Sequence, residues 1–263
     1  AVGLIGIFFI YAFVNMAMVQ GLMPVVGIPL PFMSYGGTAM MSLLISFGRL
    51  GDIFGRRRVY LLGIVLFTFL SESTGQAVRS LVAREPLVRK VDFPRFAVPL
   101  ATVLAASFNL GLNLVVVLIF LVVAGAPLLW GWLLFPVVVA VLVIFALGLS
   151  TLLATAYVRF RDVDPIWSVI LQIVFYASGV FFTFDAIAKH EHGQLLVDLL
   201  LFNPFAALLG VARHVLLGPT WPLPWDAMSS PWLIVIPATL IVVTCVAGVL
   251  IFRRRAPAIA EEL

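Results

Sequence analysis

The residues that usually carry chemistry are sparse in this 263-residue chain, and their spacing predicts no catalytic centre. The three histidines are His190, His192 and His214. The first two are neighbours at i and i+2, which do not share a helix face, so we expect a loop rather than a metal pair. The single cysteine, Cys245, lies in an apolar run and predicts no thiolate site. No catalytic residue, metal or cofactor is therefore expected.

The chain also lacks a Gly-x-x-x-x-Gly-Lys-Ser/Thr phosphate loop. That loop cradles nucleotide phosphates with its backbone N–H groups. If ATP drives a process in which this chain takes part, we expect a separate subunit to bind the nucleotide.

Composition indicates the elements that hold the remaining polar residues. Hydrophobic residues make up 63% of the chain and charged residues 11%, whereas soluble domains are about 25% charged. Residues 96–158 carry no charge, and this stretch is about twice as long as one bilayer crossing needs. The sequence therefore predicts an all-α, polytopic transmembrane helical bundle of about six crossings, with additional re-entrant or interfacial helices. Because the basic residues stand in short clusters between apolar runs, they indicate loops and not a nucleic-acid surface.

Four crossings are predicted at residues 96–125, 133–158, 166–184 and 232–252, and a further helix at 1–19. Basic clusters precede the first of the four, separate the second from the third, and follow the last, which places all three clusters on the cytoplasmic side. The segment 185–231 has more acidic than basic residues and is predicted to lie outside. Within it, residues 195–201 and 206–217 are too short to cross, and Asn203-Pro204 breaks them into a re-entrant pair.

The region around residues 59–70 is harder to place, because its apolar core of about twelve residues lies between two basic clusters. Three interpretations stay open. The segment is re-entrant, one of the basic clusters lies outside, or the N-terminal part was not shaped together with the rest. We expect a polar turn at residues 49–58 and a helix end at Ser71-Glu-Ser-Thr-Gly75.

From about residue 59 to residue 263 the chain resembles the membrane permease subunits of ABC exporters for polysaccharides, O-antigens and teichoic acids. Five phrases carry the resemblance: Ser71-Glu-Ser-Thr-Gly75, Leu87-Val-Arg-Lys-Val-Asp-Phe-Pro-Arg95, Tyr157-Val-Arg-Phe-Arg-Asp-Val163, Leu201-Phe-Asn-Pro-Phe205 and Ala212-Arg-His214. The resemblance implies a multi-pass permease of the cytoplasmic membrane, acting as a homodimer with an ABC ATPase subunit that binds ATP. It also implies a lipid-linked glycan as substrate.

Two other resemblances lie in the first quarter of the chain. Residues 21–37, from Gly21-Leu-Met-Pro to Ser34-Tyr-Gly-Gly37, are similar to a loop of the cell-wall glycan polymerases of the SEDS type. Residues 48–58 are similar to a loop motif of major facilitator transporters. We therefore divide the chain into an atypical N-terminal membrane segment, 1–58, and a permease-like domain, 59–263. The alternatives are an inactive chimera or fragment of a glycan polymerase that acts as a membrane interaction module and, less well supported, a facilitator-type carrier.

The resemblance assigns two sets of candidate residues. Composition and side of the membrane, together with the family, predict ATPase docking by Arg84, Leu87, Arg89, Lys90, Asp92, Phe93, Arg95, Arg159, Arg161 and Asp162. The polar and aromatic residues of the crossings predict a translocation path at Asn109, Asn113, Gln172, Phe175, Tyr176, Phe181 and Phe182. Interhelical hydrogen bonds explain the polar members equally well, and a packed core with an interfacial belt explains the aromatic ones.

Overall fold

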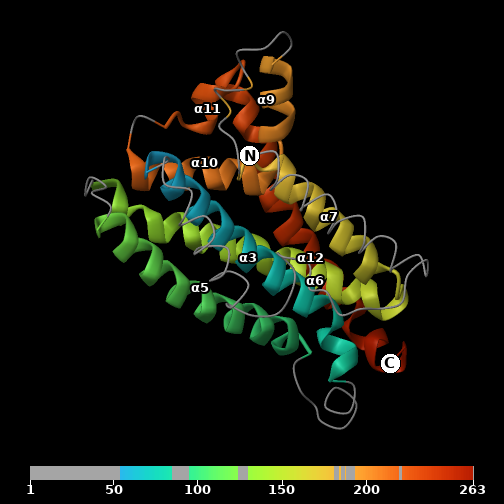
Figure 1. The fold of residues 1–263 in the computed structure, drawn as a ribbon. Coiled ribbons are helices and arrows are strands. Elements are labelled where there is room, and N and C mark those ends of the chain that lie inside the picture. The colour runs from blue at the N-terminus through green and yellow to red at the C-terminus, as the bar shows by residue number, and fades with distance from the viewer. Residues whose placement is uncertain are drawn as a thin grey trace, which may run out of the picture. The chain divides into compact units, whose positions relative to one another are not determined.

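The computed structural model describes residues 54–84, 95–123, 130–180, 184, 187, 193–218 and 221–262. By its internal contacts the chain divides into Ala1–Ile53 and Phe54–Leu263, and all described residues belong to the second unit. The predicted crossing at 1–19 and the loop at 21–37 lie outside the described residues. In the described part every regular element is a helix, as predicted (Figure 1).

Three of the four clear crossings are confirmed as long apolar helices. They are α5 (Ala97–Val123), α6 (Phe135–Arg159) with the 3-10 turn η1 (Trp130–Leu133) before it, and α12 (Val235–Glu262) after the turn η2 (Pro231–Ile234). The apolar windows of these helices have a mean hydropathy of 2.3 to 2.8 and are long enough to span a bilayer. Sequence hydropathy alone therefore located them.

Helix α7 (Val163–Ala177) corresponds to the fourth predicted crossing but is shorter than expected. It begins three residues before the predicted start and ends seven residues before the predicted end. The hydroxyl of Ser178 donates to the carbonyls of Val174 and Phe175, at 2.6 and 3.1 Å, and Gly179 has φ 67°. Glycine adopts this left-handed conformation without strain, so it ends the helix there. The apolar run continues past the helix, which is why composition predicted a longer one.

Helix α3 (Phe54–Ala83) corrects the prediction for the region around residues 59–70. It is one continuous helix, and its part Tyr60–Ala83 is apolar enough and long enough to cross the membrane. The expected polar turn is helical from Phe54 onward, and the predicted helix end at residues 71–75 is wrong. Burial explains the difference, because Ser73, Thr74 and Ala77 pack inside the bundle, where small polar residues are tolerated.

The two predicted short helices and the break between them are confirmed as α9 (Gly193–Leu201) and α10 (Pro204–Leu217), which bend by 98° at the break. Their re-entrant placement in the membrane stays a prediction. Asn203 is the N-cap of α10, and its side-chain oxygen accepts from the N–H of Phe205 at 3.0 Å. Pro204 occupies the first turn, where its missing N–H costs no hydrogen bond. In Figure 1 α10 lies across the bundle near one end, beside α9 and the short α11 (Pro224–Ala227).

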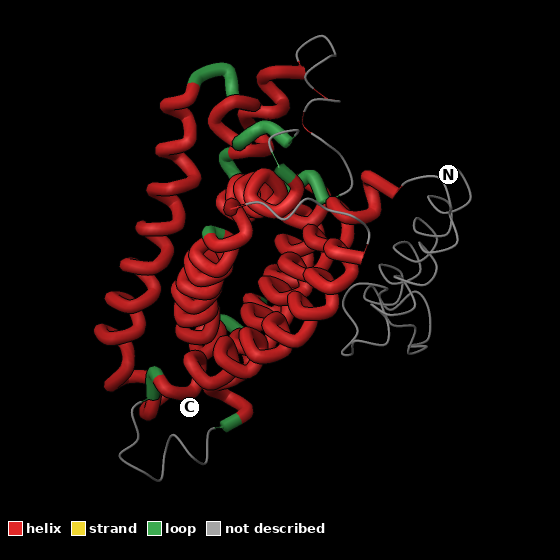
Figure 2. Tube along the Cα trace, turned by 90° about the vertical axis from the view of Figure 1, so that its left-hand side faces the viewer, coloured by secondary structure: helices red, strands yellow, loops and turns green. Residues whose placement is uncertain are grey.

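Two hydrophobic clusters mark opposite ends of this unit. Leu81, Val98, Ala154, Val158 and Phe252 form one cluster, which joins the end of α3, the start of α5, the end of α6 and α12. Phe184, Val197, Leu201, Ala206 and Met228 form the other, beside the re-entrant pair. The first cluster packs together the helix ends that carry the basic residues. Figure 2 shows helices of the described part running alongside one another.

Helices α6 and α12 approach closely at two glycines. A Cβ atom on Gly248 would collide with the carbonyl oxygen of Gly148, and one on Gly148 would lie 2.6 Å from the Cα of Cys245. Any larger residue at these positions would force the two helices apart. Small residues at such crossings allow the backbone contact that holds membrane helices together.

Candidate functional site

The predicted docking residues that the structure describes lie at one end of the bundle. Arg84 follows the end of α3, Arg95 precedes α5, and Arg159, Arg161 and Asp162 connect α6 to α7. Arg95 is half-buried and the other four are exposed. The cluster around Leu81 and Phe252 explains this arrangement, because it packs the four helix ends against each other. The result is a charged surface assembled from segments far apart in the sequence.

Two of these arginines lie over aromatic rings of the same connection. The guanidinium of Arg159 is 5.5 Å from the ring centre of Phe160, and that of Arg161 is 5.3 Å from the ring centre of Tyr157. Such contacts contribute about 0.5–1 kcal/mol at exposed sites and orient the planar cation. The connection therefore presents positioned cations on its surface.

An ion pair that the sequence did not predict joins α3 to α7 at this end. The Nε–H of Arg79 donates to Asp164 Oδ2 at 2.9 Å, and a terminal nitrogen of the same guanidinium also contacts Oδ2. One turn inward, the indole N–H of Trp167 donates to the hydroxyl of Thr74 at 3.0 Å. Thr74 in turn donates to the carbonyl of Leu70, so these contacts position the start of α7 against α3.

The remaining predicted docking residues lie outside the described residues. They are Leu87, Arg89, Lys90, Asp92 and Phe93. Their role stays a prediction.

The predicted polar path residue Asn109 hydrogen-bonds across helices. Its side-chain N–H donates to Glu72 Oε1 on α3 at 3.1 Å, and Gln76 donates to the same oxygen at 3.2 Å. Asn109 is exposed, and both Glu72 and Asn113 are half-buried. Interhelical hydrogen bonding, the alternative explanation for the polar residues, is thus present at Asn109. It involves the carboxylate of Glu72, which lies near the centre of the span Tyr60–Ala83 that the structure reveals.

Sequence reasoning missed Glu72 because it ended the helix there. The signal was available in the residues that follow, since Ala77, Val78 and Leu81 are apolar and are buried with Ser73 and Thr74 at helical spacing. Extending the helix by this pattern would have placed Glu72 near the middle of the span Tyr60–Ala83. A carboxylate at that depth suggests function, because charged groups there are costly.

The predicted path residues on α7 have different surroundings. Gln172 and Tyr176 are exposed, but Phe175 is 4% exposed and packs on Phe67 with ring centres 4.6 Å apart. Phe67 also contacts the ring of Phe205 on α10. Phe175 therefore belongs to an aromatic core, which matches the alternative interpretation of this run. Phe181 and Phe182 lie outside the described residues.

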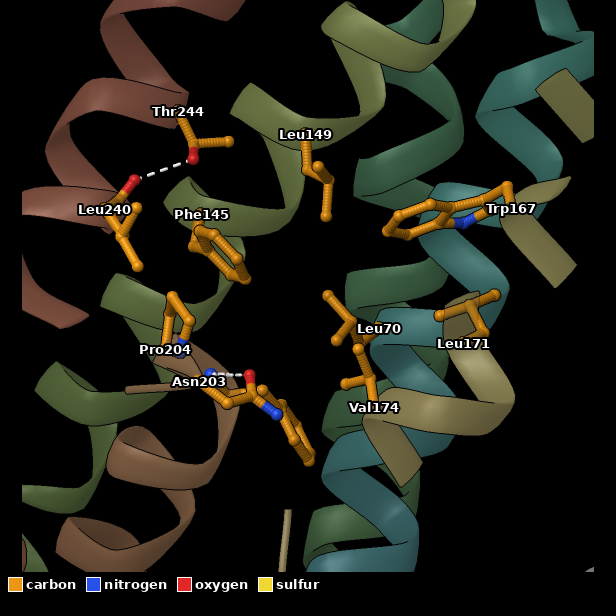
Figure 3. A pocket seen from close by; sticks show the side chains of 11 residues that line it. Leu70, Phe145, Leu149, Trp167, Leu171, Val174, Asn203, Pro204, Leu240 and Thr244 are labelled. Atoms are coloured by element: carbon orange, nitrogen blue, oxygen red, sulfur yellow. Dashed lines mark hydrogen bonds between the residues drawn. The ribbon is translucent and has the colours of Figure 1, made fainter. Parts of the chain in front are cut away.

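A cavity of about 250 Å³ lies where α3, α6, α7, α12 and the α9–α10 bend meet (Figure 3). Its walls are mostly apolar and include Leu70, Phe145, Leu149, Leu171 and Leu240. The polar members are the side chains of Trp167, Asn203 and Thr244, and the indole N–H and the Thr244 hydroxyl are already bonded elsewhere. Such a lining suits hydrocarbon and cannot satisfy the many hydroxyls of a sugar.

Arg213 ties the re-entrant helix to the end of α7. The side chain is 3% exposed, and one terminal nitrogen donates to the carbonyls of Gly179 and Val180 at 2.9 and 3.2 Å. These carbonyls follow the end of α7 and have no partner within that helix. Sequence analysis placed Arg213 in the predicted outer segment and in the phrase Ala212-Arg-His214, whereas the structure makes it a buried packing residue.

Among the residues that the structure describes, no three His, Cys, Asp or Glu side chains gather in a way that could hold a metal ion. The main features are instead the charged surface at one end of the bundle and the hydrogen bond between Asn109 and Glu72.

Comparison with known proteins supports two of the three resemblances, those to ABC exporter permeases and to SEDS-type glycan polymerases. The family model described as "ABC-2 type transporter" matches residues 34–217, and the one described as "Cell cycle protein" (FtsW/RodA/SpoVE) matches residues 1–58. The two matched ranges overlap at residues 34–58. The chain thus carries sequence features of two membrane-protein families.

Individual relatives follow the same division. The O-antigen export system permease protein RfbA of Myxococcus xanthus is 31% identical over 147 residues, which is 56% of this chain and 55% of that protein. A Klebsiella pneumoniae protein of the same name is 24% identical over 160 residues, or 60% of each chain. The peptidoglycan glycosyltransferase MrdB of Escherichia coli K12 is 49% identical over 57 residues, which is 22% of this chain and 15% of that protein.

The match therefore spans little more than half the length of the permease relatives and a small part of the glycosyltransferase. The ABC-2 match, in contrast, covers well over half of this chain, and it includes α3, α5, α6, α7 and the re-entrant pair. The long apolar helices agree with a multi-pass membrane protein. On these grounds the chain belongs to the ABC-2 type transporter family of membrane proteins.

Proposed function

We propose that this chain is the transmembrane subunit of an ATP-driven exporter that moves a lipid-linked polysaccharide or related glycan across the cytoplasmic membrane. The observation that carries the proposal is the ABC-2 match over residues 34–217, together with relatives named as O-antigen export permeases. A separate ABC ATPase binds and hydrolyses ATP. A second copy of the chain completes the path, because one set of about six crossings forms only half of it.

The charged end of the bundle is the proposed docking surface for that ATPase. Support comes from the exposed side chains of Arg84, Arg159 and Arg161 on one surface. Residues 85–94 join α3 to α5 at this end and contain Leu87 and Phe93 among the charges of Arg89, Lys90 and Asp92. An aromatic residue surrounded by charges is a common arrangement at protein interfaces, where the buried aromatic dominates the affinity.

The docking proposal is tested by pull-down of the ATPase with Phe93→Ala, Lys90→Ala and Arg161→Ala at matched expression. Phe93→Ala should weaken association roughly tenfold or more, and Lys90→Ala should weaken it less, because rim charges contribute little. Asp226→Ala, at an exposed position of α11 beside the other hydrophobic cluster, is the surface control. Full association of Phe93→Ala with the ATPase would refute the docking assignment.

The energy source is tested with the purified chain and its reconstituted complex. The chain alone should not hydrolyse ATP, and glycan should reach the outer side only when the ATPase is present. Hydrolysis that persists after removal of every partner would contradict the proposal.

Membrane side is tested by labelling single cysteines in sealed cells. Reagent applied from outside should miss cysteines placed at Arg84 and Arg254, and should label one placed at Asp226 of α11, which is exposed. The reverse pattern would invert the proposed orientation.

A second candidate function rests on the match of residues 1–58 to the "Cell cycle protein" family. In that case the chain is an inactive chimera or fragment of a glycan polymerase and acts as a membrane interaction module. Co-purification separates the two proposals. An ABC ATPase recovered with the chain favours the exporter, whereas recovery of cell-wall synthesis proteins without an ATPase favours the module.

A further inference from the structure

Helix α3 carries a line of polar side chains on a partly exposed face. Thr68, Glu72 and Gln76 follow one another at i+4 spacing and are half-buried, and Ser71 and Gly75 lie beside them. The opposite face of the same helix packs inside the bundle through Leu66, Phe69, Leu70 and other buried side chains. We call residues 68, 71, 72, 75 and 76 of α3, with Asn109 and Asn113 of α5, the polar stripe.

Glu72 lies in the middle of the polar stripe along α3, and it also lies near the middle of the membrane-spanning segment. It is the thirteenth residue of the 24-residue span Tyr60–Ala83, so it lies near the middle of the membrane. Its Oε1 accepts hydrogen bonds from Gln76 and Asn109, at 3.2 and 3.1 Å. Within the described residues no side chain donates to Oε2, and no cation pairs with Glu72. The carboxyl group thus keeps an acceptor oxygen available.

Contact with lipid does not suit this arrangement. A charged or strongly polar group at the bilayer centre costs several kcal/mol unless water or protein solvates it. The exposed faces of other spans show what suits lipid, since α12 presents Val242, Val243 and Val246 at comparable depth. The polar stripe therefore faces water or another polar surface.

A second copy of the chain packed on the stripe is a weaker explanation. Ser71 and Gly75 have the spacing of small residues at helix contacts, which would favour such packing. Close two-fold packing at this face, however, would bring Glu72 toward its symmetry mate and place like charges together in a low dielectric. Residues 1–48 carry no charged side chain and would bring no counter-ion if they covered the stripe.

The chemistry of the stripe fits a ligand rich in hydroxyl groups. A carboxylate oxygen accepts from O–H donors, and the amides of Gln76, Asn109 and Asn113 can both donate and accept. One carboxylate alone does not make a metal site, and the described residues hold no group of three such ligands. Sugars present alternating donors and acceptors, which a line of amides around a carboxylate can match.

We propose that Glu72, held by Gln76 and Asn109, is a mid-membrane hydrogen-bonding site for sugar hydroxyls in a water-filled path along α3. This inference rests on the proposed function, because it assigns the glycan of that exporter as the ligand. Glu72 contacts the passing glycan through its carboxylate, and the two amides orient the carboxylate. The site neither forms nor breaks a covalent bond.

Water access is the first measurement. In a Cys245→Ala background, single cysteines at Glu72, Gln76 and Val243 are exposed to a charged methanethiosulfonate, which reacts with the thiolate formed in water. Val243 is the matched control, because it lies at the centre of the span Pro231–Arg255 and is 60% exposed among apolar residues. Labelling at 72 and 76 should be at least roughly tenfold faster than at 243. Equal, negligible rates at all three positions would overturn the water-filled path.

A cysteine at Gly75 tests the competing explanation. A Cβ atom there meets no atom within 4 Å, so the substitution fits without distortion. Rapid disulfide cross-linking of Gly75→Cys between two chains, together with no labelling at position 72, would assign the stripe to a dimer contact and overturn the proposal. Labelling without cross-linking supports it.

Ligand contact is measured as glycan reaching the cell surface in a strain that depends on this exporter. Glu72→Gln keeps an acceptor and should retain most of the export, whereas Glu72→Leu should reduce it roughly tenfold or more. Membrane levels and ATPase association of both variants should equal those of the wild type. If the wild type exports glycan and Glu72→Leu exports it equally well, the role proposed for Glu72 is wrong but the proposed exporter function stands. If the wild type with its ATPase exports no glycan, the proposed function fails, and the labelling result still reports whether the stripe is wetted.

Discussion

Helices α3 and α12 have membrane spans of nearly equal length, 24 and 25 residues, but they are held in the protein in opposite ways. The apolar window of α3 has a mean hydropathy of 1.4 and is two-thirds buried, whereas that of α12 has a mean hydropathy of 2.7 and is 11% buried. A span packed inside the bundle can carry serine and threonine, as α3 does at Ser73, Thr74 and Ser80, because their hydroxyls find hydrogen-bond partners there. A span exposed to hydrocarbon cannot, so its sequence has to be apolar.

The largest expected effect on stability is at the contact between Gly148 of α6 and Gly248 of α12. Gly248→Leu should lower the free energy of unfolding by about 3 kcal/mol, because its side chain would meet the Gly148 carbonyl and push the helices apart. Thermal unfolding in detergent, followed by intrinsic fluorescence, measures this. Gly111→Leu on α5 is the matched control, since a Cβ at Gly111 meets nothing within 4 Å. Equal melting temperatures of the two variants would show that α12 does not depend on close backbone packing.

A smaller effect is expected at the polar contact that holds α3 to α7. Trp167→Phe keeps the aromatic ring but removes the indole N–H that donates to Thr74, and should cost about 1 kcal/mol. Combining it with Thr74→Val in a double-mutant cycle isolates the pair. A coupling energy near zero would mean that the hydrogen bond between Trp167 and Thr74 does not help to hold α3 against α7.

The smallest effect is expected at the exposed ion pair of Arg79 and Asp164. The Arg79 side chain is 68% exposed, so Arg79→Ala should cost no more than about 1 kcal/mol, and the loss should shrink as salt is added. Melting temperatures at low and high salt measure this. A large loss that salt does not change would indicate that Arg79 is shielded from water by a partner.

The fold could be predicted wherever a short stretch of sequence determines the local structure. Apolar length gave α5, α6 and α12, and the Asn203-Pro204 dipeptide gave the break between α9 and α10, because proline restricts its own backbone and that of its neighbour. The end of α7 was missed by seven residues, since a serine and a glycine ended the helix within an apolar run. Helix α3 was predicted only as far as about residue 70, because its second half contains many polar residues, several of which are buried against other helices.

The candidate site divides in the same way. The clusters of basic residues, and the side of the membrane they favour, followed from counting Lys and Arg along the sequence. Their assembly into one surface required the packing around Leu81 and Phe252. The partners of Asn109, and the position of Phe175 in a core and not on a surface, could not follow from spacing within one helix.

By itself, the sequence determined that this protein spans the membrane, where most of its helices lie and which family it resembles, because hydropathy, proline and charge act along the chain. Tertiary structure decided that Glu72 lies at mid-membrane against Asn109, that Gly148 and Gly248 bring α6 and α12 into backbone contact, and that Arg213 is buried. The physical reason is that the free-energy cost of burying a polar group depends on the atoms that surround that group. Likewise, a position requires glycine only where atoms of another helix leave no room for a Cβ. In a bundle, those atoms come from other helices.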